Sequence, residues 1–406
     1  MLENSVIEVL PQEIDLLLSE AEESWDLLFD GLSQEQVQQA DFNENATVST
    51  ASSVEQLTKV ADKAQLTPVL DEAAKSNFRF PYNVIVGTNR ADDLAGTNQA
   101  DIILGLDGDD FLVGLGGNDI IVGGNGNDEQ FGNRGNDVII GGAGNDLLSG
   151  GRVSDTGEID TANYGFLSQA ITLEAVGVVN KGSLGSDRIV SIEKIVGAFG
   201  KNNAIDGSTG TSGVTSFDIN LQNNQLTVNN IPGLGNVNFI VENFVDVTGT
   251  SQADNVVGND RDNRLIGGDG NDNLLGGGGA DILVGGAGSD NLTGGTGADL
   301  FEFTFFDLFA DRITDFNRAE GDRLSISFFG SGFDSVSYDR FDFDAGSGNL
   351  TFDGQEIADI NAQSGFNLEQ DLNITGATIA PSSQPVVLEP ANPTFEPFAP
   401  EGGFVV

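Results

Sequence analysis

A repeat of nine residues constrains the fold of this chain more than any other feature of its sequence. Between residues 105 and 149 the chain reads GLDGDDFLV, GLGGNDIIV, GGNGNDEQF, GNRGNDVII and GGAGNDLLS, five consecutive blocks in one register. The register extends two blocks upstream and recurs in six more blocks between residues 249 and 302. The shared pattern is G-G-x-G-x-D-x-U-x, where U is a large apolar residue. A unit this short buries its apolar face only by stacking on its neighbours.

Each position of the repeat suggests a physical role. Position 1 is Gly in all thirteen copies, and a fixed Gly marks backbone with positive φ or a close approach of two chain segments. Position 8 is apolar in twelve copies, and only Gln130 departs. Six turn residues followed by three strand residues therefore predict coils that stack around one continuous core. The alternative, a flexible linker rich in Gly, Asn and Asp, does not account for thirteen glycines in register.

The aspartates of the repeat require a cation. Position 6 is Asp in twelve copies and Asn263 in the other. Stacking sets these carboxylates about 4.8 Å apart, one strand spacing, where uncompensated like charges oppose folding. Calcium resolves this conflict because it accepts carboxylate and carbonyl oxygens in flexible geometry. The predicted calcium ligands are Asp92, Asp101, Asp110, Asp119, Asp128, Asp137, Asp146, Asp254, Asp272, Asp281, Asp290 and Asp299.

The nonapeptide resembles the haemolysin-type calcium-binding repeat of the RTX family. The resemblance covers roughly residues 83–376, strongly in the two repeat blocks and weakly between them. It includes the segment after Phe301, in which Asp311, Ile313, Asp315 and Phe316 match an element that closes RTX rolls. The resemblance implies a parallel β-roll with calcium ions between turns, held by the Asp side chains and by turn carbonyls. The glycines assigned to the ion sites on this basis are Gly114, Gly123, Gly141, Gly267, Gly276 and Gly285.

The sequence predicts an all-β protein, a parallel β-roll or β-solenoid in two blocks with a β-rich spacer and a β cap. Residues 1–79 are expected to form a small acidic helical leader and a linker, 80–151 the first roll, and 152–248 the spacer. Residues 249–302 form the second roll and 303–380 the cap. Two hairpins are expected, one over Phe217–Val228 and one with Phe341 and Phe343 facing Leu350 and Phe352.

Composition narrows the functional classes. The chain has 63 acidic against 17 basic residues and a net charge of −46, which excludes a nucleic-acid partner recognised through phosphates and disfavours an anionic membrane surface. It has no Cys and no His, so disulfides, thiol chemistry, HExxH zinc proteases and Ser-His-Asp triads are excluded. No segment is long and apolar enough for a transmembrane helix, and the N-terminus lacks the features of a signal peptide.

These observations predict a secreted, non-enzymatic calcium-binding repeat protein that folds on calcium binding into a rigid extracellular scaffold. Residues 381–406 form a Pro-rich tail whose end, Glu401 followed by Gly, Gly, Phe, Val and Val, resembles the uncleaved signal of type I secretion substrates. The expected partners are calcium ions, a type I secretion system and cell-surface polysaccharide. Two alternatives stay open, a polysaccharide lyase or epimerase that uses carboxylates for acid–base chemistry, and a surface adhesin or surface-layer component. No catalytic residue is assigned.

Two arginines depart from the repeat. Arg90 and Arg261 replace the position-4 Gly in early copies of the two blocks. We expect each guanidinium to stand where an ion would lie and to pair with Asp92 or Asp254, because an always-charged donor can bridge carboxylates without calcium. The alternative is that an edge turn simply tolerates a long side chain.

Overall fold

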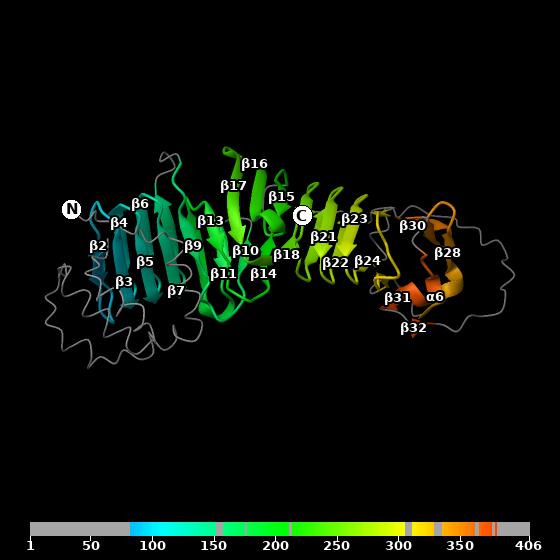
Figure 1. Cartoon of the computed structure of the whole chain (residues 1–406), viewed down its shortest axis with the longest axis horizontal. Helices are drawn as coiled ribbons and strands as arrows, with labels where there is room; N and C mark the ends of the chain where they lie inside the picture. The colour runs from blue at the N-terminus through cyan, green and yellow to red at the C-terminus, as the bar shows by residue number, and fades with distance from the viewer. Residues whose placement is uncertain are drawn as a thin grey trace, which may run out of the picture.

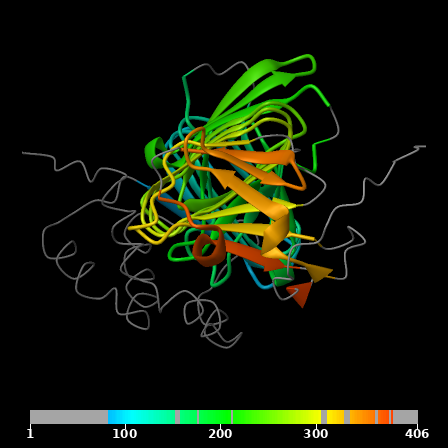
Figure 2. The same cartoon turned by 90° about the vertical axis from the view of Figure 1, so that its right-hand side faces the viewer.

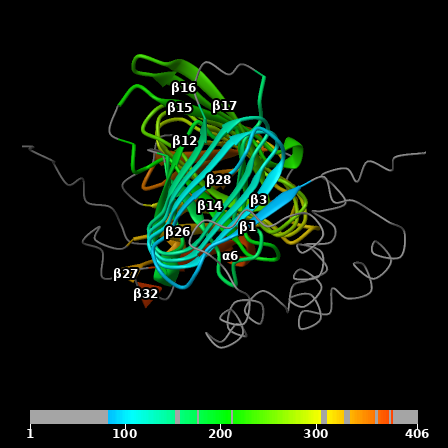
Figure 3. The same cartoon turned by 90° about the vertical axis from the view of Figure 1, so that its left-hand side faces the viewer.

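The computed structural model of the chain describes residues 82–151, 157–174, 177–210, 213–304, 311–328, 335–361, 365–375 and 378–379. These residues form an elongated body in which strands stack side by side along its length (Figure 1). Figure 2 views the body from the end that carries the cap, and Figure 3 views it from the end that carries the first strands. The expected helices before residue 80 and the expected tail after residue 380 lie outside the described residues. Within the described part no helix is both long and apolar enough to cross a membrane.

Two long sheets make up the body. The first has sixteen strands in the order β1, β3, β5, β7, β9, β13, β17, β16, β15, β19, β21, β23, β25, β30, β29 and β28. Their bounds, in the same order, are Asn83–Val86, Asp101–Asp107, Ile120–Asn125, Val138–Ala143, Thr161–Asn163, Lys194–Val196, Gly235–Glu242, Gln225–Ile231, Ser216–Asn220, Asn255–Val257, Asn273–Gly278, Asn291–Thr296, Asp311–Ile313, Gln355–Ile360, Asn349–Phe352 and Phe341–Asp344.

The second sheet has fourteen strands in the order β2, β4, β6, β8, β12, β11, β10, β14, β18, β20, β22, β24, β26 and β31. Their bounds, in the same order, are Asp93–Ala95, Phe111–Gly116, Glu129–Arg134, Leu147–Gly151, Ser186–Val190, Val178–Asn180, Thr172–Glu174, Asn203–Asp206, Phe244–Thr248, Arg264–Asp269, Ile282–Ala287, Leu300–Thr304, Arg323–Ser327 and Leu372–Thr375. The remaining described elements are β27 (Ser335–Val336), β32 (Thr378–Ile379), the short 3-10 helices η1 (Gly182–Leu184), η2 (Leu221–Asn223) and η3 (Tyr338–Arg340), and α6 (Leu368–Asp371).

One coil of the roll is two nonapeptides, with one strand in each sheet. Successive strands of a sheet pair in parallel, and their partners lie eighteen residues apart, as in Ile103 with Ile121 and Ile121 with Ile139. The second block repeats this register, as in Leu274 with Leu292. The predicted all-β parallel roll is therefore confirmed.

The two sheets continue through the segment between the blocks (Figure 1). In the first sheet β16 pairs antiparallel with both β15 and β17, and Phe217 faces Val228 in the predicted hairpin. In the second sheet β11 pairs antiparallel with both β10 and β12. Among the described strands, five lie between β7 and β19 in one sheet and five between β8 and β20 in the other. The two sheets therefore advance by the same number of strands before the second block begins.

The core lies between the sheets, and the position-8 side chains form its central row within the two repeat blocks. Those that are 0% exposed are Ile103, Leu112, Ile121, Ile139, Leu148, Val256, Leu265, Leu274, Leu283, Leu292 and Phe301. At the C-terminal end a group of Phe rings closes the stack, and Phe341 faces Phe352 across the second predicted hairpin with ring centroids 4.8 Å apart. Burial of this much aromatic surface stabilises the end of the solenoid.

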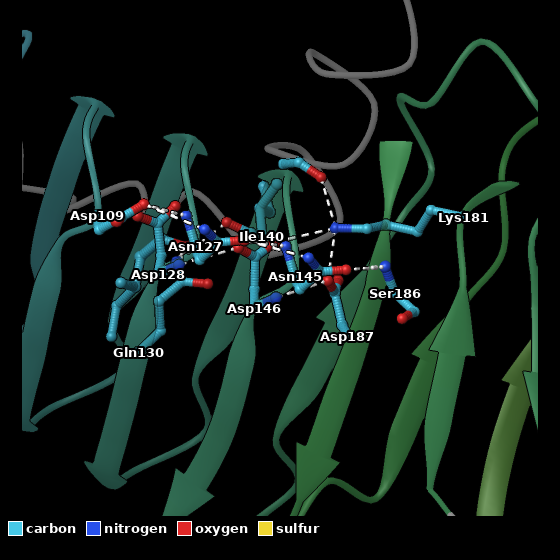
Figure 4. Close-up of polar contacts among 12 residues, drawn as sticks. Asp109, Asn127, Asp128, Gln130, Ile140, Asn145, Asp146, Lys181, Ser186 and Asp187 are labelled. Carbon is cyan, nitrogen blue, oxygen red and sulfur yellow. Dashed lines mark hydrogen bonds and ion pairs between the residues drawn. The ribbon is translucent and has the colours of Figure 1, made fainter. Parts of the chain in front are cut away.

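Gln130 interrupts that core. It lies between Leu112 and Leu148 in the second sheet and is 0% exposed. Its Nε2 donates to the carbonyl oxygens of Ile140 at 3.0 Å and Ile121 at 3.4 Å, whereas its Oε1 has no partner among the described residues (Figure 4). The buried apolar residues consequently fall into a small cluster before Gln130 and a large one after it.

Candidate metal sites

The position-6 side chains form rows that run along the stack. In each coil the backbone N–H of the position-6 residue donates to Oδ1 of the Asp one coil further on, as from Asp110 to Asp128 at 2.9 Å and from Asp272 to Asp290 at 2.8 Å. One row of the first block contains Asp92, Asp110, Asp128 and Asp146, and the other contains Asp101, Asp119 and Asp137. The second block has one row with Asp254, Asp272 and Asp290, and another with Asn263, Asp281 and Asp299. The structure therefore gathers the predicted aspartates into four rows.

The second oxygen of these carboxylates is left without a partner. Oδ2 is buried and accepts no hydrogen bond from any described residue in Asp110, Asp119, Asp128, Asp137, Asp272, Asp281, Asp290 and Asp299. These side chains are at most 2% exposed. A buried carboxylate oxygen without a donor is costly, because the group loses its hydration and gains nothing in return. The rows therefore need a positive partner.

The position-1 glycines leave room beside these oxygens. A Cβ built on Gly276 would lie 2.2 Å from Asp281 Oδ2 and 2.5 Å from the carbonyl oxygen of Gly294, one coil further on. A Cβ on Gly123 would lie 2.2 Å from Asp128 Oδ2 and 2.6 Å from the carbonyl oxygen of Gly141. Both distances are shorter than real Cβ contacts, so only Gly fits. At both glycines there is thus a recess bounded by one carboxylate and one carbonyl oxygen.

The six glycines assigned from the resemblance supply such carbonyls. Each one faces the position-1 Gly of the preceding coil at 2.1–2.6 Å from a built Cβ, and the six are Gly114, Gly123, Gly141, Gly267, Gly276 and Gly285. Each of these contacts has a position-6 oxygen beside it, that of Asn263 in the case of Gly276 and of an Asp in the other five. The glycines act here through backbone oxygens rather than side chains.

Oxygen donors of this kind fit calcium. Among the described residues no group of three or more His, Cys, Asp or Glu side chains is placed to hold a metal ion. Each coil instead offers one carboxylate per row together with backbone carbonyls, and a hard cation with flexible coordination accepts that mixture. Zinc and other metals that prefer nitrogen or sulfur ligands are poorly served by it. The residues present therefore fit calcium.

The pKa values of the aspartates in the rows also favour a bound cation. Burial is the main cause that raises the pKa of Asp119, Asp128 and Asp137 to about 7; the backbone hydrogen bond to each carboxylate opposes the increase, and neighbouring carboxylates add to it. Burial likewise raises the pKa of Asp272 and Asp281 to about 7, and the aspartates of adjacent coils add to the increase. Without a cation the folded coils disfavour the ionised carboxylates, which a divalent ion would stabilise.

Three predicted ligands at the starts of the rows have a different environment. Oδ2 of Asp92, Asp101 and Asp254 accepts both the N–H and the hydroxyl of a Thr at position 2 of its own repeat. In Asp254 these two bonds come from Thr250 and measure 2.6 and 3.1 Å. Asn263 replaces the carboxylate with an amide whose Nδ2 donates to the carbonyl oxygen of Val245 at 2.8 Å. These first coils therefore satisfy their position-6 oxygens with the chain's own donors.

The structure also extends the rows with residues that the nonapeptide pattern missed. Asp137 N–H donates to Asp160 Oδ1 at 2.9 Å, and Asp146 N–H donates to Asp187 Oδ1 at 3.0 Å. Beyond the second block the corresponding acceptors are Asp311 and Asp322. All four are followed two residues later by an apolar residue, as positions 6 and 8 of the repeat require. The fragment D-x-U could therefore have revealed Asp187, Asp311 and Asp322, whereas Asp160 is followed by the small Ala162.

The expected role of the two arginines is wrong. Arg261 Nη2 donates to the carbonyl oxygen of Phe244 at 2.9 Å, while Thr250 and the N–H of Phe217 occupy the oxygens of Asp254. Arg90 is exposed, and Thr88 supplies the donors for Asp92. Short local donors reach these carboxylates more directly than a guanidinium, so the arginines are not needed there.

A second ladder of hydrogen bonds runs along position 5. Asn127 N–H donates to Asp109 Oδ1 at 2.8 Å, and Asn145 N–H donates to Asn127 Oδ1 at 2.9 Å (Figure 4). Ser186 N–H continues the ladder to Asn145 Oδ1 at 2.9 Å. In this ladder the acceptor lies one coil before the donor, whereas at position 6 it lies one coil after. Each turn is thus tied to both of its neighbours.

Comparison with known proteins agrees with this architecture. The family model for the RTX calcium-binding nonapeptide repeat matches residues 86–121, 95–130, 122–156, 248–283 and 275–303. No curated protein sequence matches the chain. Among solved structures, the extracellular lipase LipA from Serratia marcescens is 16% identical, with a TM-score of 0.21. That alignment covers 72% of this chain and only 40% of the lipase. The chain therefore contains RTX calcium-binding nonapeptide repeats in two blocks, and these repeats form the coils of the roll.

Proposed function

We propose that the chain is a secreted calcium-binding protein that folds on calcium binding into a rigid extracellular scaffold. The observation that carries the proposal is the set of buried carboxylate oxygens without a hydrogen-bond partner among the described residues, one in each of eight nonapeptides. The same atoms border the recess beside each position-1 Gly. A divalent ion would supply the positive charge that these oxygens lack.

The folding role follows from the energetics of the rows. The recess contains oxygens from two successive coils, so the site exists only when the coils are stacked. Binding free energy is then folding free energy, and the folded state is favoured in proportion to calcium activity. With Kd on the order of 10⁻⁴–10⁻³ M, as in extracellular calcium modules, the chain would stay unfolded at cytosolic calcium and fold outside the cell.

The proposal includes export of the chain from the cell and its contact with the cell surface. Export through a type I secretion system with an uncleaved C-terminal signal is part of the proposal, and the matched RTX repeats support it. Contact with cell-surface polysaccharide is the proposed scaffold role. The alternatives of a polysaccharide lyase or epimerase, and of an adhesin or surface-layer component, stay predictions. Analysis of products after the folded chain is incubated with isolated polysaccharide would identify an enzyme, and binding of the folded chain to whole cells would identify an adhesin.

The test is far-UV circular dichroism of the full chain across a calcium titration. We expect a largely disordered spectrum in chelator and a β spectrum at about 5 mM calcium, above the affinity range of such modules. Asp281→Asn, which removes one charge from a row, should raise the calcium midpoint. Asp218→Asn, at an exposed position of β15, removes the same charge and should not. An identical spectrum with and without calcium would rule out the proposal.

A further inference from the structure

The row that contains Asp110, Asp128 and Asp146 ends differently from the others. Oδ2 of Asp110 and Asp128 has no partner among the described residues, but Oδ2 of Asp146 lies 2.9 Å from Lys181 Nζ. The Lys181 side chain is 0% exposed. A fully buried ammonium is tolerated only where oxygens surround it. Lys181 therefore has a specific reason to lie here.

The Lys181 ammonium has three oxygen contacts from two successive coils. It donates to the carbonyl oxygen of Gly142 at 2.7 Å and to Asp146 Oδ2 at 2.9 Å, and it lies 2.5 Å from Asp187 Oδ1 (Figure 4). Asp146 and Asp187 are consecutive members of the row, because Asp146 N–H donates to Asp187 Oδ1. One turn carbonyl and two stacked carboxylates are the kind of oxygen set that the regular coils offer to an ion.

The same recess is present at this position. A Cβ built on Gly141 would lie 2.4 Å from Asp146 Oδ2 and 3.0 Å from Asp187 Oδ2. Gly141 thus borders the same type of oxygen-lined space as Gly123 one coil earlier. The difference is that a cationic side chain reaches the oxygen.

Lys181 reaches the carboxylate of Asp146 because the chain contains additional residues between Asp146 and the next member of the row, Asp187. In the regular coils the two aspartates joined by the position-6 hydrogen bond are 18 residues apart, whereas Asp146 and Asp187 are 41 apart. The extra residues include β10 and β11, and Lys181 follows β11 directly. Its backbone N–H donates to the carbonyl oxygen of Gly185 at 2.8 Å, and its carbonyl oxygen accepts from Gln169 Nε2. The backbone on both sides of the ammonium is therefore fixed.

We propose that Lys181 is a tethered cation that takes the place of one calcium ion at the end of the first roll. The inference rests on the proposed calcium-binding function. Its ammonium neutralises part of the charge of Asp146 and Asp187, and a calcium ion at the same oxygens would face a positive charge within about 3 Å. The junction between β8 and β12, where the nonapeptides end, thus closes with one ion fewer than the row geometry provides.

The experiment counts bound calcium per full-length chain by equilibrium dialysis with elemental analysis, and follows folding by circular dichroism. Lys181→Met keeps an unbranched side chain of similar length but removes the charge. We expect it to bind one more calcium ion than the wild type and to need more calcium to fold. Lys194→Met is the matched control, since Lys194 pairs with Glu242 at 2.9 Å on a partly exposed face. It should leave both values unchanged.

Asp187→Asn gives an independent count. If Lys181 is the cation of this site, Asp187→Asn removes no ion, and the number bound stays at the wild-type value. One ion fewer than the wild type would overturn the inference, as would a Lys181→Met chain that folds with the wild-type count. If Lys181→Met fails to fold at saturating calcium, the Asp187→Asn count decides. A wild-type chain that binds no calcium would overturn the proposed function itself, which the two variants do not address.

Discussion

Replacement of Gln130 by Leu should stabilise the first roll, because a polar side chain occupies a core position that is apolar in every other repeat. Gln130 is 0% exposed between Leu112 and Leu148, and its Oε1 has no partner among the described residues. Full burial of a Leu side chain contributes about 1.5–3 kcal/mol. Removal of a buried unpaired acceptor contributes about 1–3 kcal/mol more.

The substitution also has a cost. The carbonyl oxygen of Ile140 loses the 3.0 Å hydrogen bond from Gln130 Nε2, and the carbonyl oxygen of Ile121 loses a longer one. The loss of a partner for a buried carbonyl costs about 1–3 kcal/mol. The net expectation for Gln130→Leu is a stabilisation of about 1–3 kcal/mol, since the two gains exceed the loss of the bond to Ile140 together with the weaker 3.4 Å bond to Ile121.

The assay is thermal unfolding at a fixed saturating calcium concentration, with amide hydrogen exchange of β3–β8 as the local readout. Hydrogen exchange is needed because a long solenoid can open in parts. The reverse change, Leu148→Gln on the adjacent coil, should destabilise the same strands. A Gln130→Leu chain whose first roll exchanges faster than the wild type would show that the bond to Ile140 outweighs the apolar contact, and would refute the reasoning.

Three further predictions concern the rows. Asp281→Ala should raise the calcium midpoint of folding more than Asp92→Ala, because Asp281 Oδ2 has no donor among the described residues whereas Asp92 Oδ2 has two. Equal midpoints for the two variants would contradict the claim that carboxylates inside a row depend on calcium more than those at its start. Gly276→Ala should raise the calcium midpoint, since its Cβ would meet Asp281 Oδ2 at 2.2 Å, while Gly213→Ala, with nothing within 4 Å, should not. Thr250→Val removes the hydroxyl that donates to Asp254 Oδ2 and accepts from Gln252 N–H. It should lower the stability of the second roll by about 1–3 kcal/mol, measured by urea unfolding in calcium, and Thr250→Ser should restore it.

The regular part of the molecule could be predicted from the sequence because one short pattern fixes it. The pattern predicted stacked coils with an inward residue at position 8, and the structure adds that one coil takes two repeats, so that Ile103 pairs with Ile121 and Ile121 with Ile139. The aspartate rows follow from the same register. The hairpin at Phe217–Val228 was also predictable, since its alternation surrounds a turn in which Asn224 adopts a φ of 58°.

The environment of each ligand was less predictable, because it depends on contacts between coils. Position 2 distinguishes Asp254, whose Oδ2 accepts two bonds from Thr250, from Asp281, whose Oδ2 has no partner among the described residues. That difference is visible in the sequence only once the turn geometry is known. Lys181 was beyond sequence reasoning, because its contact with Asp146 spans 35 residues and an irregular detour.

Each sheet has the same number of strands between the two repeat blocks, and this equality limits how such a chain can change in length. The antiparallel strand β16 in one sheet and β11 in the other each add a hairpin, and the five strands between the blocks are equal in number on both sides. Deletion of one hairpin alone would leave the two faces out of step by two strand spacings, about 9.6 Å. The coils of the second block would then meet the first at different heights on their two sides. Insertions in this solenoid are therefore tolerated as compensating pairs, and a shortened version has to lose both hairpins together.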